Sequence, residues 1–280
     1  MAAPRAGVAS NPGRTPAAHL PAMDAARARF RRCPNLAGMV ETRPRVQREV
    51  VSFVRRSARM NPSQEKAWNE HADWVVRVPA RHTSTSVAPD TRIDWPAVFG
   101  RQAPLVVEIG GGTGDVIASV AAAHPERNHL AFEVFEPAVA STLSKCARAG
   151  VDNVRVVVAN AVDALGTLID DHALAELWTF FPDPWPKKRH HKRRLVSRPF
   201  ADLVAAKLAG DGVWRLATDS DDYALAMRAV LDDHPLLVNP YDGWAPRWED
   251  RPRSRYEAKG IAAGRRIHDL CYGIREGGRR

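Results

Sequence analysis

Short apolar runs alternate with helix-like segments from residue 104 onward, and this alternation restricts the fold more than any other feature of the sequence. The runs rich in β-branched residues are expected to be strands, and they cover residues 105–109, 129–133, 154–158, 177–181 and 213–217. The expected helices cover residues 115–123, 137–149, 160–168, 198–208 and 221–231. Strands that alternate with helices form a parallel sheet with helices on both faces. The sequence therefore predicts an α/β protein with a doubly wound, mostly parallel sheet, to which residues 267–274 add a last strand, antiparallel or at an edge.

The part of the sequence before this pattern differs from it. Residues 1–45 are rich in Ala, Pro and Arg and lack apolar periodicity, which favours a disordered basic tail. An organellar transit peptide is the competing interpretation, because the segment has many arginines and few acids. Asn61, Pro62 and Gln64 form a capping-box-like start for a helix that extends to about His71. We therefore expect a tail, followed by a single domain over residues 46–280 that carries an N-terminal helical extension.

Positive charge is concentrated in two segments. The 41 Lys and Arg residues exceed the 32 Asp and Glu residues by nine, and six of these cations lie in the segment Lys187–Arg194. The segment Arg247–Arg255 adds further cations. A basic run is often only a solvated face, but charge at this density favours a phosphate-rich partner such as a nucleic acid.

Composition and cysteine spacing limit the other classes of partner and compartment. No run of about 18 apolar residues occurs, so the chain is not expected to span a membrane. Cys33, Cys146 and Cys271 are widely spaced and form no CxxC motif, which indicates a reducing compartment, the cytoplasm, and neither a disulfide framework nor a zinc site. His190 and His191 have no metal-ligand partners nearby in the sequence, so no metal is expected.

An acid stands at the end of the fourth expected strand. The two prolines of Pro182-Asp183-Pro184 exclude both helix and central strand, so Asp183 is expected to be held stiffly there. Trp185 follows, and stacking on a base or capping the core suits it equally. The acid, the aromatic residue and the cationic run after them predict a site for a polyanionic substrate.

Glycines directly after the first expected strand predict a cofactor site. The dinucleotide spacing G-x-G-x-x-G fails, because Asp115 stands where the third glycine is needed. Residues 108–114 read E-x-G-x-G-x-G instead, with Glu108 at the strand end. Glu133 ends the next strand, where a carboxylate can accept hydrogen bonds from both ribose hydroxyls. Asn160 follows the third strand, near the expected adenine edge, although a helix N-cap suits it equally. This set predicts an adenosyl ligand without phosphates, such as S-adenosylmethionine.

With these residues assembled, the chain resembles the bacterial tRNA (guanine-N7)-methyltransferases from about residue 48 to its end. The matching segments are EIGGGTG at 108–114, FEV at 132–134, NAVDAL at 160–165, FFPDPWPKKRHHKRR at 180–194, ATDSDDY at 217–223, SRYEAKG at 254–260 and, weakly, FVRRSARMNPSQ at 53–64. The segment at 180–194 is highly specific, whereas EIGGGTG marks S-adenosylmethionine-dependent methyltransferases in general. The resemblance implies a Rossmann-like class I methyltransferase fold and methylation of a variable-loop guanosine of tRNA at N7, with no obligate protein partner.

The resemblance also implies roles for individual residues, in three sets. The cofactor-binding set is Glu108, Gly110, Gly112, Glu133, Asn160 and Asp183. The substrate-binding set is Lys187, Asp219, Ser254, Arg255, Tyr256 and Glu257. The RNA-contact set is Arg189, His190, His191, Lys192, Arg193 and Arg194. The chain departs from the family pattern in having Asn160 where many relatives have Asp, Ala131 and Ala138 in place of glycines, and Ser254-Arg255-Tyr256 in place of a Thr-Lys-Phe-type sequence.

Asp183 is also the expected catalytic residue. Guanine N7 has a free lone pair and no proton, so its methylation requires no general base and depends on orientation. Positive charge appears on the purine as the methyl group moves, and we hypothesise that the Asp183 carboxylate stabilises it. For the substrate set, Lys187 also suits an ordinary surface lysine, Asp219 a helix N-cap, Tyr256 the core, and Arg255 with Glu257 a surface ion pair.

Three other functions compete with this interpretation. A methyltransferase of another nucleic acid or of a small molecule has the same cofactor site. A nicotinamide oxidoreductase is disfavoured by the failed dinucleotide spacing. A non-catalytic RNA-binding module needs only the basic run, and it leaves Glu108, Gly110, Gly112, Glu133 and Asp183 unexplained.

Overall fold

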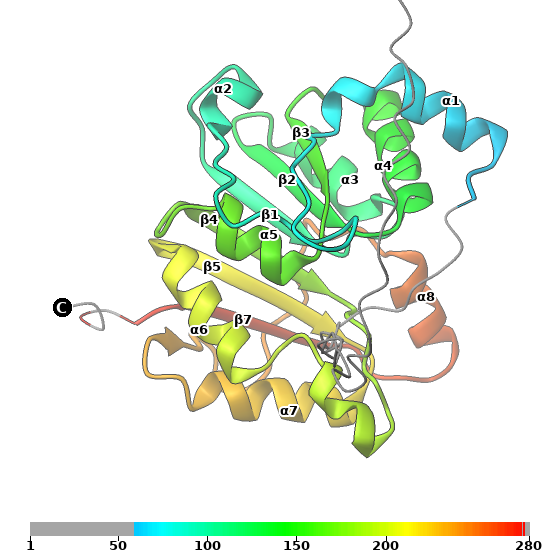
Figure 1. Cartoon of the computed structure of the whole chain (residues 1–280). Coiled ribbons are helices and arrows are strands. Elements are labelled where there is room, and N and C mark those ends of the chain that lie inside the picture. Colours follow the sequence, from blue (N-terminus) through cyan, green and yellow to red (C-terminus); the bar gives the residue numbers. More distant parts are fainter. Residues whose placement is uncertain (1–58, 276, 278–280) are drawn as a thin grey trace, which may run out of the picture. The chain divides into compact units, whose positions relative to one another are not determined.

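The computed structural model describes residues 59–275 and residue 277 (Figure 1). The predicted basic tail over residues 1–45 lies outside the described residues, so the tail and the domain boundary at residue 46 stay predictions. Among the described helices, none has both the length and the apolar character needed to cross a membrane.

Seven strands in the described part of the chain form one sheet. Their order across the sheet is β3 (Val154–Val158), β2 (Asn128–Glu133), β1 (Leu105–Ile109), β4 (Leu174–Phe180), β5 (Leu208–Thr218), β7 (His268–Ile274) and β6 (Leu237–Val238). The strands β1 to β5 pair in parallel, and β7 pairs antiparallel with β5 and β6 (Figure 1). The predicted α/β class, the mostly parallel sheet and the antiparallel last strand are confirmed. The two-residue strand β6, which the sequence did not indicate, lies outside β7.

Helices cover both faces of the sheet. Helices α5 (Ala161–Leu168), α6 (Arg198–Lys207) and α7 (Asp221–Asp232) contribute to the largest apolar cluster, together with Trp95 of the short helix α2 (Trp95–Phe99). Helices α3 (Asp115–Ala123) and α4 (Glu136–Ala149) form a second cluster against β2 and β3. This arrangement is the doubly wound architecture that alternating strands and helices require.

Strand β1 shows how the layers place a functional side chain. Leu105, Val107 and Ile109 point to the cluster of α5, α6 and α7, whereas Val106 packs with residues of α3. Because side chains alternate across a strand, Glu108 lies on the same face as Val106. All five residues of the strand are buried. A carboxylate is therefore carried into the interior at the carboxyl end of a central strand.

The N-terminal helix begins as predicted. In α1 (Pro62–Glu70), Asn61 accepts a hydrogen bond from Gln64 N at 3.0 Å, and the Gln64 side chain accepts one from Asn61 N at 3.0 Å, which completes the capping box. The Gln64 amide also donates to Pro137 O at 2.9 Å. The helix therefore packs on α4 and lies close to the carboxyl ends of the strands.

Candidate functional site

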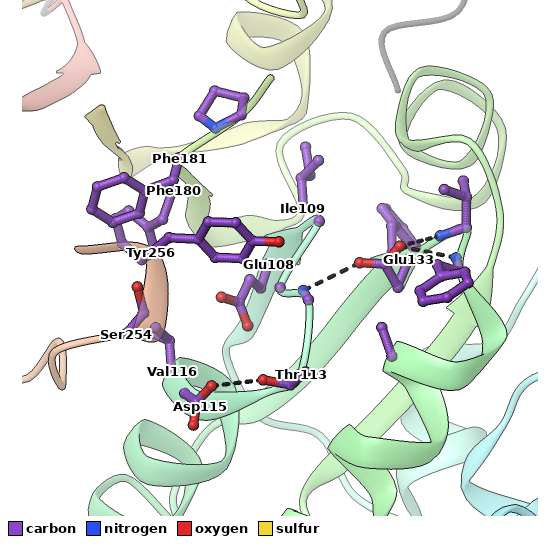
Figure 2. A pocket seen from close by; sticks show the side chains of 18 of the residues that line it. Glu108, Ile109, Thr113, Asp115, Val116, Glu133, Phe180, Phe181, Ser254 and Tyr256 are labelled. Carbon is purple, nitrogen blue, oxygen red and sulfur yellow. Dashed lines mark hydrogen bonds between the residues drawn. The ribbon is translucent and has the colours of Figure 1, made fainter. Parts of the chain in front are cut away.

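A cavity of about 430 Å³ opens at the carboxyl ends of β1, β2 and β4 (Figure 2). In a parallel sheet this edge is where ligands bind. Its wall is completed by residues of helix α8 (Arg255–Ala262), and it is lined by these predicted site residues: Glu108, Gly110, Gly112, Glu133, Asp183, Ser254, Arg255 and Tyr256. The fold thus brings together, in one cavity, residues that are far apart in the sequence.

The glycine loop after β1 depends on its glycines for two different reasons. Gly110 and Gly112 have φ values of 67° and 57°, which favour glycine. Gly111 is required by space instead, because a Cβ atom there would lie 2.6 Å from Glu108 Oε2. The loop and the Glu108 side chain are therefore fitted to each other.

Glu108 is a buried acid that forms no ion pair with a cation within the described part of the chain. Its side chain points into the cavity (Figure 2), and Oε2 has no hydrogen-bond partner among the described residues. Burial raises the pKa of Glu108 from its usual 4.5 to about 8, and the nearby carboxylates of Glu133 and Asp115 contribute to the rise. A buried acceptor of this kind is suited to a cationic or hydrogen-bond-donating ligand.

The Glu133 carboxylate accepts hydrogen bonds from backbone amides. The donors are Gly112 N at 3.2 Å, Val134 N at 2.7 Å and Phe135 N at 2.9 Å (Figure 2). These bonds tie the end of β2 to the glycine loop. A carboxylate has about four acceptor positions, so binding both ribose hydroxyls requires Glu133 to release at least one of these amides. Its role toward a ribose stays a prediction.

Asp183 lies on a segment that is fixed at both ends. Phe181 and Trp185, on either side of Pro182-Asp183-Pro184, have φ values of 52° and 44°, which are strained for bulky residues. The Phe181 amide donates to Ala217 O of β5 at 2.7 Å, and Pro184 O accepts from Arg194 Nε at 2.9 Å. Strain that is held by surrounding bonds is common at functional sites. The segment therefore presents the Asp183 side chain at a defined place on the cavity wall.

Asn160 caps helix α5, as one of its two predicted roles required. Its side chain accepts a hydrogen bond from Val162 N at 3.1 Å. Its neighbours Ala159 and Ala161 line the large cavity, whereas Asn160 itself lines a second cavity of about 370 Å³ beside the basic run. A contact of its side chain with an adenine stays a prediction.

The basic run forms a 3₁₀ helix, η2 (Lys188–Arg193), directly after exposed Lys187. Arg189 and Lys192 are exposed, and the Arg193 guanidinium stacks over the Trp185 ring at 3.7 Å, with His190 at the ring's edge. Arg194 is different, because it is buried and its guanidinium binds Pro184 O and Asp222. The predicted RNA contact of Arg194 is therefore corrected, since its side chain holds the Asp183 segment in place.

Among the other predicted substrate residues, some line the cavity and some are bound elsewhere in the fold. Ser254 caps α8 by accepting from Glu257 N at 3.2 Å, and Tyr256 is 55% exposed and points over the cavity (Figure 2), so it is not a core residue. Asp219 accepts from Arg265 Nε at 2.8 Å, and the N-cap of α7 is Ser220, so Asp219 is not a helix cap.

Glu257 requires a correction. It is 1% exposed and does not line the cavity, because it is paired with Arg247 at 2.8 Å beneath α8. Neither direct contact with a substrate nor a surface pair with Arg255 agrees with this position. The same pair shows that the cations of residues 247–255 are not all available to a polyanion.

Among the further residues that line the cavity and that the sequence did not single out for it are Gln64, Ser141 and Lys259. The capping box predicted the helix that carries Gln64, but not that it lies on α4. For Lys259 a signal existed, because Ser254 followed by Glu257 at the third position is a typical helix start. That start predicts a helix with Arg255 and Lys259 one turn apart.

Comparisons with known proteins agree with this geometry. A family model described as "Putative methyltransferase" matches residues 102–270. The tRNA (guanine-N(7)-)-methyltransferase of Cutibacterium acnes is 55% identical over 241 residues, which cover 84% of this chain and 87% of that protein. A protein of the same name from Nocardioides sp. is 46% identical over 231 residues, covering 80% and 87%. One from Bordetella pertussis is 44% identical over 180 residues, covering 64% and 71%.

Proposed function

This chain belongs to the family of tRNA (guanine-N7)-methyltransferases, and on that premise we propose that it methylates N7 of a guanosine in the variable loop of tRNA, with S-adenosylmethionine as the methyl donor. The observation that carries the proposal is that two acids from neighbouring parallel strands, Glu108 at the end of β1 and Asp183 after β4, line one cavity. We further propose that the protein acts in the cytoplasm, where tRNA is available.

The residues of the cavity fit S-adenosylmethionine. Its volume of about 430 Å³ lies within the range of small-molecule sites. Glu108 Oε2 is a buried acceptor with no hydrogen-bond partner among the described residues, so a ligand with a donor or a positive charge would suit it. Glu108, the loop Gly110–Gly112 and Glu133 would hold the donor, and when bound it supplies an electrophilic methyl group on a sulfonium. No third phosphate-binding glycine is present, which suits a ligand without phosphates.

Asp183 is proposed to orient and stabilise the guanine. A carboxylate accepts hydrogen bonds, and guanine offers the N1–H and N2–H donors on one edge. Holding that edge would fix the direction of the N7 lone pair, which is what an in-line transfer requires. The negative charge would also stabilise the positive charge that develops on the purine in a cavity partly shielded from water. The two prolines and the bonds of Phe181 and Pro184 support this role by keeping Asp183 in place.

Lys187 and the exposed cations of η2 are proposed to bind the tRNA backbone beside the cavity. Lys187, Arg189 and Lys192 are exposed on the segment that follows Asp183. Phosphate contacts by such residues give affinity that depends on salt and not on sequence. Selection of one guanosine therefore rests on the shape of the tRNA and on the fit of the base in the cavity.

Replacing Gly111 with alanine is expected to weaken binding of S-adenosylmethionine by about 10- to 100-fold, the loss of a hydrogen bond to a charged group. The added methyl group would overlap the Glu108 carboxylate, 2.6 Å away, and push it from its position. Calorimetric titration of the tRNA-free protein measures the effect. Gly166→Ala in α5 is the matched control, because its Cβ atom would meet only Leu203 at 3.9 Å. Equal affinities for both variants would contradict the fit between loop and acid.

The proposed function is tested by incubating the protein with methyl-labelled S-adenosylmethionine and unfractionated tRNA, and then mapping the label. We expect it in 7-methylguanosine of the variable loop. A tRNA transcript with adenosine in place of that guanosine is the control and should stay unlabelled. Label in another nucleoside, in another RNA or in a small molecule would replace the proposed substrate by a different one.

A further inference from the structure

Arg251 is a charged residue that is almost completely enclosed. It is 1% exposed, and its guanidinium forms a double ion pair with Asp269 of β7, with Nη1–Oδ1 at 2.6 Å and Nη2–Oδ2 at 3.2 Å. Nη2 also donates to Glu257 Oε1 of α8 at 3.4 Å. An arginine fits such planar partners better than a lysine does. Neither the cavity lining nor the proposed chemistry uses this residue.

Arg251 contacts two elements that contribute residues to the cavity lining. Its guanidinium lies over the Phe180 ring at 5.0 Å and near the Phe181 ring at 5.6 Å, and both rings line the cavity just before Asp183. Its bond to Glu257 reaches helix α8, which begins after Ser254 and contributes Arg255, Tyr256 and Lys259 to the cavity lining. One side chain thus contacts both the end of β4, which precedes Asp183, and helix α8.

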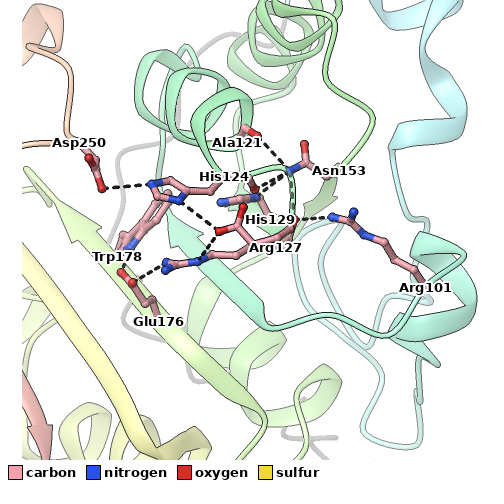
Figure 3. A network of polar contacts seen from close by, with 10 residues as sticks. Arg101, Ala121, His124, Arg127, His129, Asn153, Glu176, Trp178 and Asp250 are labelled. Carbon is pink, nitrogen blue, oxygen red and sulfur yellow. Dashed lines mark hydrogen bonds and ion pairs between the residues drawn. The ribbon is translucent and has the colours of Figure 1, made fainter.

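The segment that leads to Arg251 is anchored independently of α8. Trp248 packs on Trp178 with ring centroids 5.0 Å apart, and the Arg215 guanidinium of β5 covers it at 4.7 Å. Asp250 accepts from His124 Nε2 at 3.2 Å (Figure 3). Ala245 N donates to Asp269 O at 2.9 Å. Because these contacts fix the segment, its two arginines connect that fixed position to α8: Arg247 binds Glu257 at 2.8 Å, and Arg251 binds Glu257 together with Asp269 and the Phe180 ring.

Glu257 of α8 and its partner Arg247 form an ion pair in which the Glu257 carboxyl stays ionised. Burial works against the charge of Glu257, but hydrogen bonds from Arg247 and the positive charge of Arg251 more than offset it, so the pKa of this carboxyl lies below its usual value. Two arginines, Arg247 and Arg251, therefore face two acids, Glu257 and Asp269. Removal of Arg251 leaves Glu257 with Arg247 and takes from buried Asp269 its double ion pair.

We propose that Arg251 is a positioning residue, which holds α8 against the strand ends and thereby sets the affinity of the cavity for S-adenosylmethionine. The proposal rests on the proposed function for the identity of the ligand. It implies that a change at Arg251, which lies outside the cavity, weakens ligand binding by moving one cavity wall. It also implies that the charge alone is not enough, because a lysine cannot bind Asp269 with two parallel bonds.

The test compares Arg251→Lys, Arg251→Met and Arg215→Met in the full chain. Arg215→Met is the matched control, because it also removes an arginine that is paired with an acid, Glu176 at 2.9 Å, whereas a methionine can still pack on Trp248, and none of the described hydrogen bonds or ion pairs of Arg215 reaches α8. Calorimetric titration with S-adenosylmethionine without tRNA gives Kd, and hydrogen exchange reports the amides of residues 255–262. We expect Kd to rise about 3- to 10-fold in Arg251→Lys, by at least about tenfold in Arg251→Met, and by less than about twofold in Arg215→Met. Exchange should accelerate in α8 only in the Arg251 variants.

Two results would overturn the proposal. One is wild-type affinity in Arg251→Lys with a lowered melting temperature, which would mean a purely structural role. The other is an equal loss of affinity in Arg215→Met, which would mean general loosening of the region. Arg251→Lys retains the charge and decides the question even where Arg251→Met does not fold. A wild-type protein that binds no S-adenosylmethionine would contradict the proposed function itself, which distinguishes the two failures.

Discussion

Replacement of Asp183 by asparagine is expected to lower kcat for methyl transfer by about 100- to 1,000-fold, and replacement by alanine to abolish detectable transfer. Asparagine keeps the shape of the side chain but removes the charge that is proposed to stabilise the methylated purine. Its NH2 group is also a donor, and it would replace one of the acceptor oxygens that face the N–H donors of guanine. The fold should survive, because the segment is held by the backbone bonds of Phe181 and Pro184 and not by the carboxylate. Single-turnover methylation of a tRNA transcript gives the rate, and circular dichroism reports the fold.

The matched control for Asp183 is Asp211→Asn. Asp211 is an exposed acid of β5, away from the cavity, and its variant should methylate tRNA at the wild-type rate. Near-normal turnover of Asp183→Asn, with the same tRNA and donor, would refute the charge-stabilising role, and near-normal turnover of Asp183→Ala would refute the orienting role as well. Loss of activity in both variants would point to a general effect of the substitution.

The stability of the ligand-free protein is expected to fall with rising pH because of Glu108. Its folded-state pKa is raised by burial to about 8, from the usual 4.5 that it has in the unfolded chain. Between these values the folded state binds the proton and the unfolded state does not. The contribution of the Glu108 proton to the free energy of unfolding is therefore complete below pH 4.5. It is lost as the pH rises through about 8, by up to about 1.4 kcal/mol per pH unit. Urea unfolding of the wild type and of Glu108→Gln between about pH 5 and about pH 8 measures the difference. Parallel slopes in the two proteins would contradict the raised pKa.

The same acid links ligand binding to a proton. A cationic ligand favours the carboxylate form, so binding of S-adenosylmethionine near neutral pH should release a proton from Glu108. S-adenosylhomocysteine, which lacks the sulfonium charge, should release less. Titrations in two buffers with different ionisation enthalpies give the number of protons, and Glu108→Gln should release none while binding about 10- to 100-fold more weakly.

Much of the sheet and of the cofactor wall could be predicted, because the relevant signals are local. The β-branched run at 105–109 and the glycines after it are neighbours in the sequence, and β1 and α3 have the predicted bounds. The motif around Asp183 combines a strand end with two prolines, which act on the backbone directly. The strand β4, by contrast, begins three residues earlier than residue 177, and β5 begins five residues earlier than residue 213.

The buried charges could not be predicted, because their burial depends on partners that are distant in the sequence. Residues 247–257 look like a solvated basic surface when their charges are counted along the chain. In the fold, Arg251 meets Asp269 of a later strand and the Phe180 ring of an earlier one, and Glu257 faces inward. Arg194 belongs to a basic run that predicts contact with RNA, although Asp222 and Pro184 O bind its guanidinium. A run of like charges gives the net charge, and it does not say which members are paired.

The antiparallel insertion of β7 between β5 and β6 has a consequence for biosynthesis. The strands β1 to β5 leave the ribosome well before Asp269, which Arg251 needs as a partner. A nascent chain that stops short of β7 has the glycine loop and Asp183, but it lacks Asp269, the partner that holds Arg251 between the end of β4 and helix α8. Contacts between segments so far apart in the sequence form late. We therefore expect the ability to retain the methyl donor to arise only near the end of translation, so that incomplete chains do not sequester it.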